Sequence, residues 1–142
     1  MVVTFFGHKN SPETIKEKAE SVISGLIENH AAYTFYVGNQ GSFDYYINEI
    51  LHRLSKKYPH IKHYTVLAYM PQKNDPQTNL YNSILPEEVA TSHPKYAISK
   101  RNDWMLKKSD TVIAYITHSH GGAAKYYEKA IRQNKHIINL AD

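Results

Sequence analysis

Short apolar runs alternate with longer amphipathic stretches along most of this 142-residue chain. The runs are rich in β-branched and aromatic residues, which is typical of strands, and they cover residues 2–5, 33–37, 63–69, 111–116 and 136–140. In the stretches between them, apolar residues recur at intervals of three and four, which predicts helices. Strands that alternate with helices indicate βαβ units with right-handed crossovers and a mainly parallel, five-stranded sheet.

The predicted helices have recognisable starts and buried faces. Ser11 followed by Pro12 is typical of a helix N-terminus, and Ser42 is expected to cap the second helix. The third helix is expected over residues 95–107 and the fourth over residues 122–133. The fourth helix has an apolar face that we expect to be buried, made up of Ala123, Tyr127, Ala130 and Ile131.

Residues 70–94 differ from the rest of the chain, because they contain four of its six prolines, with Asn, Gln, Asp and Ser between them. Such a segment is long for a connection inside a compact domain, and long connections are often lids or binding segments. We expect either a lid over the functional edge of the sheet or a plain connection. The whole of residues 1–142 is expected to form one domain.

Three glycine-bearing loops follow the first, second and fourth predicted strands. Each leads directly into a helix, whose first amide N–H groups have no intrahelical partner and attract anions. The carboxyl ends of parallel strands share one edge of the sheet, so we expect the loops to converge on a site for a phosphate-bearing small molecule. A single loop of this kind is more simply a tight turn, and the prediction rests on all three. The expected ligand-binding residues are Gly7, His8, Lys9, Gly38, Gln40, Gly41, Ser42, Phe43, Asp44, Arg101, Asn102, Gly121, Gly122 and Ala123.

The charged members of this set have two interpretations each. Asp44 either complements the dipole of the second helix or accepts hydrogen bonds from a ribose or a base amine. Arg101 is either a surface residue whose aliphatic stem packs against the protein or a bidentate clamp for an anion. His8 and Lys9 follow a buried strand, where either side chain could donate to a phosphate.

The remaining composition excludes several classes of chemistry. His118 and His120, together with His8, suggest a metal, but no acidic or cysteine partner completes a tetrahedral set, so we expect no metal and no cofactor. The chain has no cysteine, and its 17 basic against 13 acidic residues form no long basic run, so we expect no nucleic-acid partner. No apolar run has the length of a signal segment or a membrane span, and we expect a cytoplasmic protein with no membrane partner.

Five segments stand in a fixed order and span nearly the whole chain: Phe6-Gly7-His8-Lys9, Gly38-x-Gln40-Gly41-x-Phe43-Asp44, Arg101-Asn102-x-x-Met105, Ser109-Asp110-x-Val112-Ile113-Ala114 and Gly121-Gly122-Ala123. As an ordered set they resemble the SLOG superfamily, which includes the DprA and LONELY GUY proteins, and within it the small YpsA-like branch. The resemblance implies a Rossmann-like, three-layer α/β/α fold and a nucleotide site formed by the glycine loops and Arg101. It also implies a homodimer.

The chain departs from the enzymes of that superfamily in its last glycine loop. LONELY GUY proteins have a Gly-Gly-x-Gly-Thr-x-x-Glu loop whose glutamate performs N-glycosidic chemistry, whereas here Ala123 follows the glycine pair and Tyr126 stands three residues later. We therefore expect a sensor, carrier or sequestering protein that binds a nucleotide or nucleotide-derived small molecule without turning it over. Two alternatives stay open. One is a nucleoside-monophosphate N-glycosidase with Asp44 or Glu128 as its carboxylate, and the other is a DprA-like protein that binds single-stranded DNA.

Overall fold

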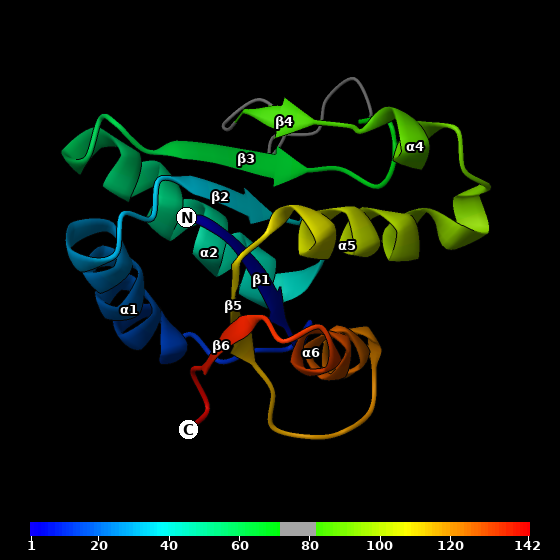
Figure 1. The fold of residues 1–142 in the computed structure, drawn as a ribbon. Helices are drawn as coiled ribbons and strands as arrows, with labels where there is room; N and C mark the ends of the chain where they lie inside the picture. Colours follow the sequence, from blue (N-terminus) through cyan, green and yellow to red (C-terminus); the bar gives the residue numbers. More distant parts are fainter. Residues whose placement is uncertain (72–81) are drawn as a thin grey trace.

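A computed structural model describes residues 1–71 and 82–142 as one parallel sheet with helices on both faces (Figure 1). The strands are β1 (Val2–Gly7), β2 (Thr34–Val37), β3 (Lys62–Val66), β4 (Ser83–Ile84), β5 (Thr111–Tyr115) and β6 (His136–Asn139). The α-helices are α1 (Ile15–Asn29), α2 (Gly41–Lys57), α4 (Glu87–Ala90), α5 (Ala97–Lys108) and α6 (Gly122–Arg132), and a 3-10 helix, η1 (Pro94–Tyr96), precedes α5.

The strands lie in the order β4-β3-β2-β1-β5-β6, and every pairing between them is parallel. The chain moves outward from β1 to β2 and β3, and then returns to place β5 on the other side of β1. This order is Rossmann-like, which confirms the predicted fold class and leaves the switch point of the sheet between β1 and β5. The prediction of five strands is wrong, because the two-residue β4 adds a sixth at the edge next to β3.

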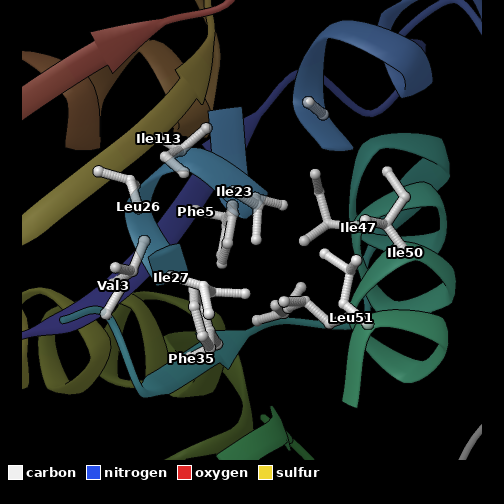
Figure 2. Close-up of a cluster of buried hydrophobic side chains, with 14 of the residues drawn as sticks. Val3, Phe5, Ile23, Leu26, Ile27, Phe35, Ile47, Ile50, Leu51 and Ile113 are labelled. Carbon is white, nitrogen blue, oxygen red and sulfur yellow. The ribbon is translucent and has the colours of Figure 1, made fainter. Parts of the chain in front are cut away.

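Alternate residues of each central strand pack against opposite helical layers, as a parallel sheet covered on both faces requires. Val3 and Phe5 of β1 pack with α1 and α2 in the cluster that Figure 2 shows. Phe6 points the other way and packs with Tyr126 of α6 and with Met105 of α5. The aromatic rings of Phe6 and Tyr126 stack with their centroids 5.4 Å apart. Both faces of β1 are therefore buried, and its carboxyl end is held rigidly.

Two of the predicted helix caps are wrong. Helix α1 begins at Ile15, four residues after Ser11, and α2 begins at Gly41 with Gln40 as its N-cap. Neither N-terminus has a side-chain cap. Instead, the Ser42 hydroxyl donates to the backbone oxygens of Lys9 and Ser11. These two serines tie neighbouring loops together, which local capping rules do not foresee.

The buried face of α6 is also displaced from the predicted one. Ala124, Tyr126 and Ala130 are buried, whereas Ile131 is 46% exposed. Ala130 is buried as predicted, and Tyr127 packs against the same cluster while half-buried. The prediction missed Tyr126, whose ring stacks on Phe6 on the same side of the sheet. None of the helices in the described ranges is both long and apolar enough to cross a membrane.

Part of the proline-rich segment has regular structure. Residues 82–94 contain β4 and α4, so this portion is not the irregular connection expected. Val89 of α4 packs against Ala68 and Ala97 in a small separate cluster. The lid expected over residues 70–94 includes residues 72–81, which lie outside the described residues.

Gly7, the last residue of β1, has no room for a side chain. A Cβ at this position would lie 2.2 Å from Cγ of Phe43, whose ring is fully buried in α2. Gly7→Ala is expected to lower the free energy of unfolding by about 2 kcal/mol, because the Phe43 ring must shift within a close-packed core. Urea unfolding measures the loss. Gly25→Ala, in α1, is the control, because a Cβ there meets nothing within 4 Å and should not destabilise the protein.

Candidate functional site

A cavity of about 600 Å³ lies at the carboxyl ends of β1 and β5 and is enclosed by residues of α2, α5 and α6. It therefore occupies the switch point of the sheet, where doubly wound α/β proteins bind their ligands. The residues that line it are Phe5, Phe6, Gly7, His8, Lys9, Asn10, Pro12, Gln40, Asp44, Ile98, Arg101, Asn102, Met105, Tyr115, Thr117, His118, His120, Gly121, Gly122 and Ala123.

The three predicted loops converge, and most of the predicted residues line this cavity. Those that do are Gly7, His8, Lys9, Gln40, Asp44, Arg101, Asn102, Gly121, Gly122 and Ala123. Gly38, Gly41, Ser42 and Phe43 do not line it, and the structure gives each of them a supporting role. Gly41, for example, has φ of 90°, and a Cβ there would lie 2.6 Å from Cα of Lys9. It allows the first and second loops to touch.

Arg101 is buried, with 3% of its surface exposed, so the interpretation of it as a surface residue is wrong. Its Nη1 donates to the backbone oxygen of Val66 at 3.3 Å and to Oδ1 of Asn39 at 3.4 Å. Its Nε donates to Oδ1 of Asn102 at 2.8 Å. Within the described residues, Nη2 donates no hydrogen bond. The guanidinium is thus fixed by the protein along one edge and keeps two N–H groups for other partners.

Asp44 lies beside Arg101, and both side chains are in close contact with Gly38. A Cβ at Gly38 would lie 2.8 Å from Cζ of Arg101 and 2.8 Å from Oδ2 of Asp44. The carboxylate accepts the amide N–H of Gln40 at 2.9 Å. Burial raises the pKa of Asp44 to about 6, although the Arg101 charge and the Gln40 hydrogen bond both oppose the rise. The same burial lowers the pKa of Arg101.

Asn48, which we did not predict, holds the second loop in place from inside α2. Its Nδ2 donates to the backbone oxygen of Gly38 at 3.0 Å. Its Oδ1 accepts from Thr65 at 2.9 Å and contacts Nε2 of His63 at 2.8 Å. The His63 ring is buried, and burial lowers its pKa to about 4. This neutral network fixes the carbonyl at the turn where Asp44 and Arg101 meet.

Asn48→Ala is expected to lower the free energy of unfolding by about 2 kcal/mol. The substitution leaves the Gly38 carbonyl and the Thr65 hydroxyl without a buried partner, and the cost of desolvation is then not compensated. Equilibrium unfolding in urea measures the effect. Ser55→Ala, on the same helix, removes a half-buried hydroxyl that bonds only its own helix and should cost well under half as much.

Three histidine rings form a stack at the mouth of the cavity. The rings of His8 and His118 lie 3.7 Å apart at 11°, and those of His118 and His120 lie 3.8 Å apart at 19°. The Thr117 amide N–H donates to Nε2 of His8 at 3.0 Å, so this nitrogen carries no proton. Within the described ranges, no group of three or more histidines or carboxylates is arranged to hold a metal ion.

The two carboxylates considered for catalysis are separated by the fold. Asp44 lines the cavity, whereas Glu128 is exposed on α6 and does not line it. The sequence suggests His118 and His120 only as metal ligands, and it does not mark Tyr115 and Ile98 as site residues. Tyr115 ends β5, the two histidines follow that strand, and Ile98 lies about one helical turn before Arg101, and these positions are the signals that could have identified them.

The sheet order defines a Rossmann-like protein with a cavity at the switch point of its sheet. The model of the YspA SLOG family matches residues 2–140, so the chain belongs to the YpsA family of SLOG proteins. The chain is also similar to the UPF0398 protein of Bacillus pumilus (strain SAFR-032), with 24% identity over 125 residues. That match covers 81% of this chain and 67% of the Bacillus protein.

Proposed function

We propose that this protein binds a nucleotide or a nucleotide-derived small molecule in the cavity between β1 and β5. The observation that carries the proposal is that Arg101 and Asp44 lie next to each other, both against Gly38, at the wall of that cavity. A buried guanidinium with free N–H groups is suited to a phosphate oxygen, and a neighbouring carboxylate is suited to a ribose hydroxyl or a base amine. The volume of about 600 Å³ is in the range of small-molecule sites.

The charge of the lining favours an anionic ligand. Lys9 and Arg101 bring two positive charges to the cavity, and Asp44 is the one carboxylate among the described residues that line it. The amide N–H groups at the start of α6 add to the same potential. We propose a role in sensing, carrying or sequestering the ligand, because Glu128 lies outside the cavity and Asp44, the other candidate carboxylate, is held beside Arg101.

A thermal-shift panel tests the proposal. AMP, ADP and ADP-ribose are compared with adenosine and with ribose 5-phosphate at about pH 7. A ligand present at about 100 times its Kd stabilises the folded state by about 2.7 kcal/mol, which is readily detected. We expect one or more nucleotides to shift the midpoint and adenosine to shift it less. Absence of any shift with the whole panel would contradict the proposal.

A further inference from the structure

The histidine stack brings three titratable rings together. His8 comes from the end of β1, and His118 and His120 come from the loop after β5, so two adjacent strands assemble the stack. Both His118 and His120 are exposed to solvent at the mouth of the cavity. The His8 ring also forms a T-shaped pair with the Tyr115 ring, with centroids 6.4 Å apart.

His8 is neutral in this arrangement for a geometric reason. Its Nε2 accepts the Thr117 N–H with the two nitrogens 3.0 Å apart, and a proton on Nε2 would point at the amide hydrogen. Burial and the nearness of His118 and His120 also lower the pKa of His8. A proton taken up by the stack would therefore lie on one of the two exposed rings, His118 or His120.

Among the described residues that line the cavity, none places an anion against such a proton. The charged groups that line the same cavity are Lys9 next to β1, Arg101 on α5 and Asp44 on α2. The first two have the same sign as a histidinium, and Asp44 is held beside Arg101 and Gly38. Two charged rings at 3.8 Å would repel each other unless an anion lay against them. A ligand must provide that charge.

We propose that His118 and His120 form a proton-linked binding site for a phosphate-type oxyanion, which takes up protons on these rings as it binds. The site deepens the proposed function, on which it rests for the identity of the cavity as a ligand site. Because binding and proton uptake are linked, affinity for the anion increases as the pH falls, by up to about tenfold per pH unit for each proton taken up. A phosphate of the nucleotide or a free oxyanion has the same chemistry here.

Sulfate tests the site without a nucleotide, because it does not titrate between about pH 6 and pH 8. Histidine ring C–H signals are followed by NMR during sulfate titrations at both pH values, with chloride at matched ionic strength as the reference. We expect a saturable change at the His118 and His120 rings, with a Kd at least about tenfold lower at about pH 6. The double variant H118N/H120N, which changes two exposed loop residues, should lose this pH dependence. H30N/H60N, which changes two exposed histidines elsewhere, should keep it.

The outcomes separate this inference from the proposed function. Equal sulfate affinity at both pH values, no saturable change, or unaltered binding in H118N/H120N would overturn the inference even if nucleotides bind. A pH-dependent sulfate site with no response to the nucleotide panel would support the inference and contradict the proposed function. Addition of AMP at about pH 6 then distinguishes the sources: displacement of sulfate assigns the site to a nucleotide phosphate, and retention assigns it to a free oxyanion.

Discussion

Arg101→Ala is expected to weaken binding of the most stabilising nucleotide by about 30- to 150-fold, the loss that accompanies removal of a charge-assisted, two-pronged hydrogen bond. The reason lies in the fixed orientation of the guanidinium. Nη1 and Nε are held by Val66, Asn39 and Asn102, so the remaining N–H groups are presented without further loss of conformational freedom. Arg101→Lys should recover only part of the affinity, because an ammonium keeps the charge but lacks the planar fork.

Isothermal titration calorimetry measures these affinities, and circular dichroism checks that each variant is folded. The check matters because Arg101 is buried and its loss also removes a hydrogen bond to the Val66 carbonyl. Arg53→Ala is the matched control, since Arg53 forms an exposed ion pair with Glu20 between α2 and α1 and does not line the cavity. If both variants are folded and bind the nucleotide with wild-type affinity, Arg101 does not contact the ligand.

The central strands could be predicted because their burial on both faces leaves long apolar runs, and β1 and β5 are the clearest examples. Strand β4 could not be predicted, because it has only two residues and is defined by its pairing with Thr65 and Val66 of β3. The order of the strands in the sheet could not be predicted for a similar reason. Periodicity reports which residues face a helix, but it does not report which strand lies alongside.

Local rules failed where tertiary hydrogen bonds took precedence over them. Ser11 and Ser42 both have the residue type of an N-cap. Instead of capping a helix, the Ser42 hydroxyl accepts the Ser11 amide N–H and donates to the Lys9 carbonyl, which joins two loops. Arg101 was ambiguous because its helical position does not reveal what covers it. In the folded chain, Gly38 lies against the guanidinium, and the turn from β2 buries it.

The supporting residues of the site were the hardest to predict, because their partners are distant in sequence. Asn48 meets Gly38, Thr65 and His63 only once α2 has packed beside β2 and β3. The histidine stack likewise requires β1 and β5 to pair, which brings His8 next to His118. The glycine loops predicted the location of the site, while the groups that fix its geometry depend on the completed sheet.

Asp44→Asn is expected to change the pH dependence of stability in a defined direction. Burial raises the pKa of Asp44 from 3.8 to about 6 in the folded state. Between these two pH values the native protein holds more protons than the unfolded chain, so the Asp44 contribution to stability falls as the pH rises. The difference corresponds to about 3 kcal/mol when the carboxylate is fully ionised in both states.

Urea unfolding of the wild type and of Asp44→Asn, measured from about pH 4 to about pH 7, isolates this contribution. The asparagine cannot ionise, and its side-chain oxygen can still accept the Gln40 amide N–H. The stability of the variant relative to the wild type should therefore rise by about 2.4 kcal/mol across the interval, since Asp44 of the unfolded chain is already partly ionised at about pH 4. Glu128→Gln, which removes an exposed carboxylate outside the cavity, should follow the wild-type profile. Parallel profiles for the wild type and Asp44→Asn would show that Asp44 ionises in the folded protein as it does in the unfolded chain, and that Arg101 fully offsets its burial.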